Sequence, residues 1–378
     1  MKKGIFLFLF FMLTNFTNAQ HHVHFVFKRL PSYHNPSDTV YLAGSFNRWN
    51  PRDKSFATVV HNNKSGITID LPKGMFEYKF TLGSWDGVES GHGGLPEENR
   101  MISIEKDTTV LIEIDDWANH FPKKHKETTA TKNVHILDSA FYMPQLNRNR
   151  RVWIYLPQSY ATTKKKYPVL YMHDGQNLFD HATAGFGEWG VDEALDTLEK
   201  QFGEMIVVAV DHAGEKRINE YAPFDTDQYG KGEGDAYVDF LVQTLMPYIN
   251  NHYRTKKSAR FTAIAGSSMG GLISYYALLK YPDRFGAAGV FSPAFWINPQ
   301  LKEYTRQRAG KAKGRMYLYA GKQESEAMVP DLLTHCEILQ QRSKLSVKSE
   351  LRDDGKHSEQ TWREEFPKFY AWLLEGFQ

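Results

Sequence analysis

The sequence predicts two folded domains, an antiparallel β-sandwich followed by an α/β domain with a mostly parallel sheet. Residues 20–120 consist of short runs in which apolar and polar residues alternate, and such runs, separated by turn residues, are typical of a sandwich. From residue 133 onward, nearly continuous apolar runs alternate with helical segments, which indicates parallel strands that are covered on both faces. An abrupt junction of strand and helix at 262–276 is the most specific feature of the second domain.

The first 19 residues have the pattern of a secretory signal peptide. Lys2 and Lys3 precede an unbroken apolar run, Ile5–Leu13, and small residues that suit a signal peptidase end at Ala19. We therefore expect cleavage after Ala19 and export to the periplasm or the medium. No other stretch approaches the roughly 20 apolar residues of a membrane-spanning helix, so we expect no membrane partner after cleavage.

Composition narrows the function classes. Cys336 is the only cysteine, so a disulfide within the chain is impossible and both domains depend on packed cores. The net charge of +2 gives no electrostatic footprint for nucleic acid. The basic clusters at 148–151 and 164–166 lack interleaved aromatic residues, which favours solvated surface over a nucleic-acid site.

Two passages of the predicted sandwich carry tryptophans. They read VYLAGSFNRWNP from Val40 to Pro51 and GMFEYKFTLGSW from Gly74 to Trp85. Both resemble the immunoglobulin-like modules that bind starch and glycogen. The resemblance implies that Trp49 and Trp85 stack on sugar rings, for which flat aromatic faces are well suited. Two alternatives stay open: both tryptophans belong to the core, or the module is only a spacer.

Residues 121–132, FPKKHKETTATK, are charged and rich in threonine with no apolar period, and they predict a linker. The α/β domain is predicted to span 133–378. Its expected strands are 134–143, 151–157, 167–174, 204–211, 261–266, 286–292, 314–321 and 345–352. A helix is expected at 235–252, where apolar residues recur at helical spacing.

The junction at 262–276, TAIAGSSMGGLISYY, passes from an apolar strand directly into an apolar helix. Within it, residues 266–270 fit the G-x-S-x-G pattern of a nucleophile elbow, with Ser268 at the centre. A side chain that points out of so tight a turn needs glycine at the two flanking positions, where a Cβ atom would clash. Centring the pattern on Ser267 would put larger residues at both positions. The sequence therefore predicts Ser268 as a nucleophile.

A serine hydroxyl needs an adjacent base, and that base needs a carboxylate to orient it. In hydrolases with such an elbow, the chain order is serine, acid, histidine. Two histidines follow Ser268: His335 lies in a helical stretch, whereas His357 follows the last strand in a polar loop and is the predicted base. The acid should follow the preceding strand, where Glu324 and Glu326 both stand, and chain order does not separate them.

Four segments together resemble the esterase D family: GSSMG at 266–270, HDGQN at 173–177, and the GKQE and GKH turns at 321–324 and 355–357. That family includes feruloyl esterases, acetyl xylan esterases, S-formylglutathione hydrolases, siderophore esterases and mycolyl transferases. The resemblance implies an α/β-hydrolase fold. In the family, the acid stands three residues after the glycine that ends the strand, which is Glu324 here, where many members have aspartate.

Further site residues are expected around this centre. The backbone N–H of Met269 follows the nucleophile and that of Gln176 is its expected partner, both directed at the negative charge that develops on the substrate carbonyl. The resemblance implies substrate contacts from the loop after Asp211 and from residues 292–296. The candidates for contact with substrate are Asp174, which lies in the loop after the third strand, and Arg217, Phe295 and Trp296, which lie in these two segments. The first two can equally serve the scaffold, and the last two suit a hydrophobic wall for an ester's acyl or aromatic part.

No cofactor or metal site is expected. Residues 225–235, DTDQYGKGEGD, match three positions of a calcium-binding loop, but the bidentate glutamate that ends such a loop is absent. No phosphate loop or dinucleotide fingerprint is present in the sequence. His22 and His24 fall on one face of an expected strand, yet two imidazoles without a third ligand indicate exposed side chains.

These observations predict an exported serine carboxylic-ester hydrolase that works through an acyl-enzyme. The expected substrate is a feruloyl or acetyl ester on a polysaccharide, because a tethered sugar-binding module raises the local concentration of a polymer near the site. A siderophore esterase that opens a catecholate trilactone is the alternative within the family. A non-catalytic carbohydrate-binding protein that keeps the fold is the alternative outside it.

Overall fold

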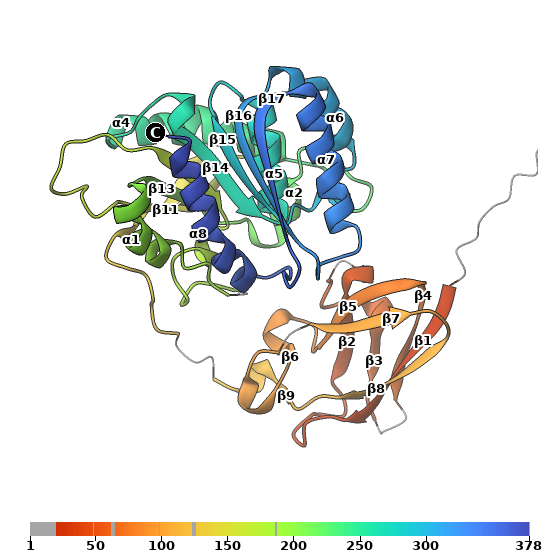
Figure 1. The fold of residues 1–378 in the computed structure, drawn as a ribbon. Helices are drawn as coiled ribbons and strands as arrows, with labels where there is room; N and C mark the ends of the chain where they lie inside the picture. Colours follow the sequence, from red (N-terminus) through yellow and green to blue (C-terminus); the bar gives the residue numbers. More distant parts are fainter. Residues whose placement is uncertain are drawn as a thin grey trace, which may run out of the picture. The chain divides into compact units, whose positions relative to one another are not determined.

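The computed structural model describes residues 20–47, 49–61, 65–97, 99–122, 126–185 and 187–377 (Figure 1). The predicted signal peptide, residues 1–19, lies outside the described residues. The chain divides into two units, Met1–His125 and Lys126–Gln378, and the division falls within the predicted linker. Along the described ranges, no helix is long and apolar enough to cross a membrane.

The first unit consists of β-sheets around one apolar core. Its strands are β1 (Gln20–Arg29), β2 (Thr39–Gly44), β3 (Ala57–Val59), β4 (Gly66–Pro72), β5 (Gly74–Thr81), β6 (Glu89–Ser90), β7 (Arg100–Ile104), β8 (Thr108–Glu113) and β9 (Asp116–Trp117). One sheet has the order β4-β1-β8, a second has β3-β2-β5-β7, and β6 pairs with β9. Alternate residues of β1, including Phe25 and Phe27, are buried in this core together with Phe80 of β5.

The prediction of an all-β first domain is confirmed, with one difference in strand pairing. The sequence predicted antiparallel strands, and β1 does pair antiparallel with β4, but it pairs in parallel with β8. Parallel neighbours need a long connection rather than a tight turn, and β1 and β8 are separated by most of the unit.

The second unit contains an eight-stranded sheet with the order β10-β11-β13-β12-β14-β15-β16-β17. The strands are β10 (Val134–Met143), β11 (Arg148–Tyr155), β12 (Val169–His173), β13 (Ile206–Val210), β14 (Thr262–Ser267), β15 (Ala287–Phe291), β16 (Lys313–Gly321) and β17 (Lys344–Arg352). From β13 to β17 all neighbours are parallel, while β10 and β11 form an antiparallel edge. The predicted mostly parallel sheet is confirmed, and the loops after its parallel strands gather at one edge.

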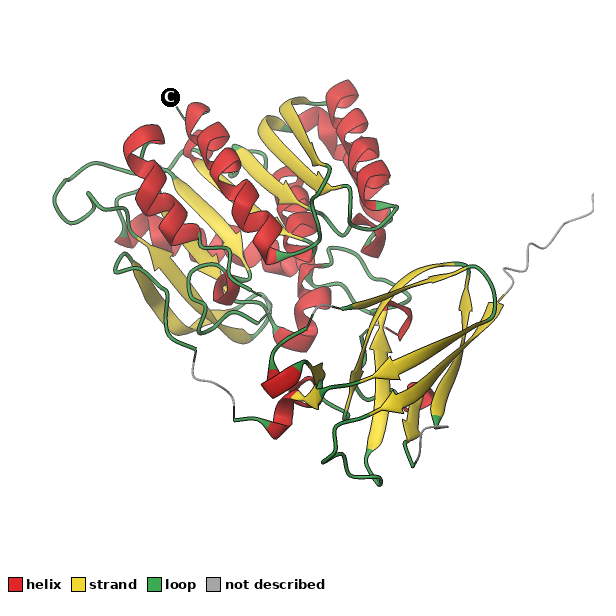
Figure 2. Ribbon diagram, turned by 60° about the horizontal axis from the view of Figure 1, so that its bottom comes forward, coloured by secondary structure: helices red, strands yellow, loops and turns green. Residues whose placement is uncertain are grey.

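Helices cover both faces of this sheet (Figure 2). One face carries α1 (Val191–Phe202) and α8 (Glu359–Glu375), and the other carries α3 (Gly234–Phe240), α4 (Met246–His252), α5 (Met269–Lys280), α6 (Gln300–Arg308) and α7 (Met328–Arg342). A short helix, α2 (Arg217–Tyr221), lies in the connection after β13. Because α5 is apolar around nearly its whole circumference, it is buried from Met269 to Leu279.

The segment predicted as one helix at 235–252 is interrupted. α3 is followed by a π-helical turn, Leu241–Leu245, and then by α4. Pro247, in the first turn of α4, has no N–H to donate, so the regular α-helical bond pattern cannot pass through it. The apolar residues that predicted the helix remain buried on both sides of the turn.

Part of the predicted linker belongs to the second unit. The Thr128 hydroxyl donates to Asp180 at 3.0 Å, and the Thr129 hydroxyl donates to Glu188 at 3.0 Å. Threonine side chains therefore hydrogen-bond the segment from residue 126 to 132 to the rest of the α/β unit. A sequence pattern without apolar period predicts a linker, but it does not reveal polar side chains that find partners more than 50 residues away.

Candidate active site

β14 ends in a sharp turn that places Ser268 at the start of α5. Ser268 has φ 55° and ψ −119°, a backbone conformation that stores strain in a residue other than glycine. A Cβ atom at Gly266 would lie 2.9 Å from the backbone of Gly270 and 2.9 Å from the His173 ring. The turn therefore needs glycine where the elbow pattern has it, and it keeps the strained serine at the end of a central strand.

Glu324 and His357 meet on neighbouring loops, after β16 and β17. His357 Nδ1 donates to one oxygen of the Glu324 carboxylate at 2.7 Å. The other oxygen accepts from the backbone N–H of Gly321 and from the Ser292 hydroxyl, each at 2.7 Å, and only 1% of the Glu324 side chain is exposed. These bonds hold the carboxylate in one place. Glu326 is exposed and, among the described residues, makes no hydrogen bond with His357.

Ser292 and Trp362 support the Glu324–His357 pair. Ser292 follows β15 with φ 44°, and its hydroxyl accepts a hydrogen bond from the Trp362 indole N–H at 2.9 Å while it donates to Glu324. The Trp362 ring also packs edge to face on His357, with 5.0 Å between ring centroids. No sequence pattern predicts this role for Ser292 or Trp362, because they are 70 positions apart and only the fold brings them together.

Ser268 is held through its backbone. Its N–H donates to the Phe291 carbonyl at 2.9 Å, and its carbonyl accepts from the Ala294 N–H at 3.1 Å. In the part of the chain that the structure describes, the Ser268 hydroxyl forms no hydrogen bond, so the structure joins His357 to Glu324 but not to Ser268. Such a bond is often long in a free enzyme and tightens when substrate binds.

The two backbone N–H groups expected to bind a substrate oxygen lie at the ends of adjacent strands. Met269 begins α5 after β14, and Gln176 lies in the 3₁₀ turn Gly175–Asn177 after β12. Within the described ranges, neither N–H donates to another protein group. The Gln176 side chain accepts from the His212 N–H at 3.0 Å, which fixes the turn. Both donors are therefore available to a ligand.

The sequence from residue 143 to 373 matches the family model described as "Esterase: Putative esterase". The chain belongs to this esterase family. The family is one of serine hydrolases and esterases, which supports an enzyme over the alternative of a non-catalytic carbohydrate-binding protein that keeps the fold. The expected α/β-hydrolase fold and esterase resemblance are confirmed.

Two known proteins are similar to a part of the esterase, and one solved structure is similar to nearly all of it. The endo-1,4-beta-xylanase/feruloyl esterase of Xylanibacter ruminicola is 25% identical over 170 residues, which are 43% of this chain and 22% of that protein. The amylopullulanase of Thermoanaerobacter thermohydrosulfuricus is 36% identical over 90 residues, 23% of this chain and 6% of that protein, and the match lies in the N-terminal part. The enterobactin esterase FES of Shigella flexneri, solved in the presence of enterobactin, has a TM-score of 0.55 at 16% identity and covers 94% of this chain and 92% of its own, which shows a shared fold.

Asp174 and Arg217 form an ion pair at the end of β12 of the esterase. Arg217 donates from Nε and Nη2 to the two carboxylate oxygens, each at 2.7 Å. Burial opposes the charged form of the carboxyl, but the charge and hydrogen bonds of Arg217 outweigh it and lower the pKa of Asp174 below its ordinary value. Arg217 takes one acceptor site on each oxygen, which gives Asp174 a scaffold role, and its contact with substrate stays a prediction.

Phe295 and Trp296 differ in exposure although they are adjacent. Phe295 is 3% exposed, stacks on His335 at 4.0 Å between ring centroids and packs against Tyr275, so it belongs to the core instead of the expected hydrophobic wall. Trp296 is 47% exposed and keeps that role as a candidate. Burial lowers the pKa of His335 to about 4, which keeps it a neutral packing residue, as its helical position suggested.

In the first unit of the esterase, Trp49 and Trp85 lie together outside the core. Their ring centroids are 6.2 Å apart at an angle of 44°. Trp85 is 44% exposed, and Trp49 is half-buried with φ 57°, which is uncommon for a bulky residue. The tryptophan in the core of this unit is Trp117. The alternative in which both predicted residues are core residues therefore does not hold, and the pair presents aromatic surface to solvent.

Proposed function

We propose that the esterase hydrolyses carboxylic esters with Ser268 as nucleophile, His357 as base and Glu324 as acid. The observation that carries this proposal is the 2.7 Å hydrogen bond between Glu324 and His357, formed by loops at the same sheet edge as the Ser268 elbow. A buried carboxylate that accepts from Nδ1 fixes the tautomer in which Nε2 is free to take a proton.

The reaction then proceeds in two halves. His357 Nε2 takes the proton of the Ser268 hydroxyl while the oxygen attacks the ester carbonyl, and the negative oxygen of the tetrahedral intermediate accepts from the N–H groups of Met269 and Gln176. His357 passes the proton to the leaving alcohol, and an acyl group remains on Ser268. Water, activated by the same histidine, releases the acid. Each oxyanion donor contributes about 3 kcal/mol of transition-state stabilisation.

We further propose that the substrates are feruloyl or acetyl esters on a polysaccharide. The support is the combination of an esterase unit with a module that has an exposed tryptophan pair and a match to an amylopullulanase. A second support is the similarity to a relative named for xylanase and feruloyl esterase activities. Tethering a sugar-binding surface to an esterase raises the effective concentration of a polymeric substrate, which is an advantage that small soluble esters do not need.

Export is part of this proposal, since an extracellular polymer is reached only by an exported enzyme. The support is the signal-peptide pattern of residues 1–19. N-terminal sequencing of protein from the periplasm or medium should begin at Gln20. Recovery of the chain in the cytoplasm with Met1 still in place would contradict export.

Removing the tryptophan pair should weaken action on polymers alone. For the double variant Trp49→Ala and Trp85→Ala, we expect KM on acetylated xylan to rise about tenfold, which corresponds to the loss of aromatic stacking on a sugar. KM on methyl ferulate should not change. Leu111→Ala, which truncates an exposed side chain on β8, is the control and should leave both values unchanged. An unchanged KM on xylan in the double variant would reduce the module to a spacer.

The choice between polysaccharide esters and a siderophore is tested with one panel on the intact esterase. Methyl ferulate, acetylated xylan and a catecholate trilactone are compared by kcat/KM. The fold shared with an enterobactin esterase makes the trilactone the relevant competitor. We expect turnover of the ferulate or the xylan to exceed that of the trilactone. Turnover of the trilactone alone would overturn the polysaccharide proposal and leave the proposed triad in place.

A further inference from the structure

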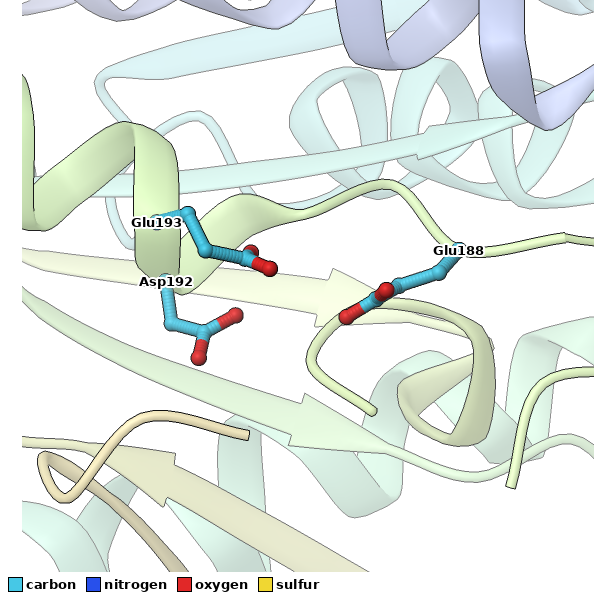
Figure 3. Close-up of side chains that lie close together, drawn as sticks. All are labelled: Glu188, Asp192 and Glu193. Carbon is cyan, nitrogen blue, oxygen red and sulfur yellow. The ribbon is translucent and has the colours of Figure 1, made fainter. Parts of the chain in front are cut away.

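Three carboxylates of the second unit face one another where α1 begins. Glu188 lies in the connection before α1, and Asp192 and Glu193 lie in its first turn. Each offers an oxygen, and these oxygens all lie within 4.8 Å of one another. Figure 3 shows the three carboxylate groups turned toward a common space. Asp192 is fully buried and Glu188 is 8% exposed, so water does not screen the cluster as it would an exposed acidic patch.

Oxygens in this cluster lack the donors that buried oxygens need. Asp192 Oδ2 accepts from the Thr131 N–H at 2.7 Å, but the buried Oδ1 has no hydrogen-bond partner among the residues that the structure describes. Glu193 Oε2 and the Thr131 hydroxyl are also buried, and neither has a hydrogen-bond partner within the described ranges. An ionised carboxylate accepts and does not donate, so the Asp192 and Glu193 oxygens cannot satisfy one another, and the Thr131 hydroxyl, which could donate, bonds to neither of them among the described residues. A native structure rarely leaves such atoms unpaired, and a bound ion is one of the few explanations.

The surrounding positive charge does not balance the cluster. Arg363 lies 3.8 Å from Glu188 and 3.8 Å from Glu193, beyond hydrogen-bond distance. The N-terminus of α1 adds roughly half a positive charge. Ionisation of all three carboxyls would leave an excess of roughly one and a half negative charges in a buried place, and burial together with the nearby Glu193 carboxylate raises the pKa of Asp192 to about 7.

We propose that Glu188, Asp192 and Glu193 bind one hard divalent cation, with Ca²⁺ as the ion that fits best. The available atoms are all oxygens, which favour Ca²⁺, Mg²⁺ or Mn²⁺ over Zn²⁺. Ca²⁺ accepts irregular sets of carboxylate, hydroxyl and water oxygens, whereas Mg²⁺ demands a near-octahedral set. The sequence pointed to residues 225–235 and to the N-terminal histidines as the only candidates for a metal site, and neither fitted one. Glu188, Asp192 and Glu193 match no known metal-binding sequence pattern, so the sequence did not predict this site.

The residues of this cluster contact both the start of the second unit and, through two tryptophans, the candidate active site. Thr129 and Thr131, from the segment that follows the unit boundary, bond to Glu188 and Asp192. The next residue after Glu188, Trp189, packs against Trp362 with 5.7 Å between ring centroids, and Trp362 contacts His357. The ion therefore stabilises the connection that carries Trp189, and the expected readout is thermal stability.

The test uses the full chain, stripped with a chelator and dialysed, and measures melting by scanning calorimetry with and without Ca²⁺. For a Kd of about 10 µM, we expect about 1 mM Ca²⁺ to raise the Tm of the α/β unit by about 5 to 10 °C. Titration calorimetry should give one ion per chain. Mg²⁺ at the same concentration should raise Tm less.

Asp192→Asn separates cation binding from general destabilisation. Asparagine keeps the shape, accepts from the Thr131 N–H and can donate to Glu193, so without Ca²⁺ its Tm should equal or exceed that of the wild type. It should lose most of the Ca²⁺-dependent increase. The control, Asp196→Asn, changes an aspartate one turn along α1 whose carboxylate accepts from Asn133 and Tyr155, and it should keep the increase.

Two results would overturn the proposal. One is a wild-type Tm that does not respond to any of Ca²⁺, Mg²⁺ and Mn²⁺, with Asp192→Asn raising Tm equally in every condition; the cluster then shares a proton instead. The other is a Ca²⁺-dependent increase that Asp192→Asn leaves intact, which places the bound ion elsewhere in the chain.

Discussion

Replacing Ser268 with alanine should abolish ester hydrolysis and leave the fold intact. We expect kcat on p-nitrophenyl acetate to fall by about 10⁴-fold or more, because no other group can take over the covalent step. The loss of one oxygen at a strained turn should change Tm by little, since the Ser268 hydroxyl has no hydrogen bond among the described residues. Both quantities are measured on the same preparation.

Ser267→Ala is the matched control for this prediction. Ser267 precedes Ser268 and ends β14, and its side chain is buried. Its alanine variant should retain activity within a few-fold. If Ser267→Ala abolished turnover and Ser268→Ala did not, the elbow would be centred one residue earlier, and the geometry described for Gly266 and Gly270 would have no catalytic meaning.

Glu324→Gln should reduce kcat nearly as much as removal of the nucleophile. One glutamine oxygen can still accept from Gly321 and Ser292, so the loop should keep its structure. The amide NH₂ would then face His357 Nδ1 in place of the carboxylate and force the opposite tautomer, which costs about 10³- to 10⁴-fold in kcat. The kcat values of the variant and the wild type decide this point.

Glu326→Ala is the control for this prediction, because Glu326 is the other candidate acid in the sequence. Glu326 is exposed and lies in the same loop, and its removal should leave kcat unchanged. A large loss in Glu326→Ala together with a small loss in Glu324→Gln would move the acid to Glu326. Small losses in both would indicate that His357 works without a carboxylate partner.

The architecture of the second unit could be predicted because its signals are local. A parallel strand covered on both faces is apolar throughout, and the central strands β12 to β15 are such runs close to where they were expected, whereas the edge strands β10 and β17 are largely exposed. The π-helical turn at Leu241–Leu245 was missed because it preserves the apolar spacing that a helix prediction uses. The hydrogen bonds that hold residues 126–132 on the α/β unit were not predicted, because their polar partners are distant in sequence.

In the candidate site, too, the residues marked by a local sequence motif could be predicted, whereas contacts between residues distant in sequence could not. Ser268 could be found from its glycines, and His357 from its loop after the last strand. Glu324 could be separated from Glu326 only by family resemblance, whereas the structure separates them by a hydrogen bond and by burial. The direction of Phe295 into the core was not predictable, since position at a strand end does not say which of two adjacent aromatic residues points inward.

The acidic cluster at the start of α1 could not be predicted from the sequence. Asp192 and Glu193 look like ordinary first-turn acids, which favour a helix N-terminus. Glu188 and Thr131 reach them only in the folded chain. The absence of donors around Asp192 Oδ1 is a property of packing, and no spacing rule reports it.

A covalent acyl-enzyme on Ser268 can be trapped and identified during turnover. The intact esterase is mixed with p-nitrophenyl acetate, quenched in acid during turnover and digested, and the peptide that contains residues 262–276 is sequenced by mass spectrometry. We expect one acetyl group on Ser268 in the wild type, and none in Ser268→Ala. Turnover with no acetylated peptide, or with the acetyl group on Ser267, would contradict this expectation.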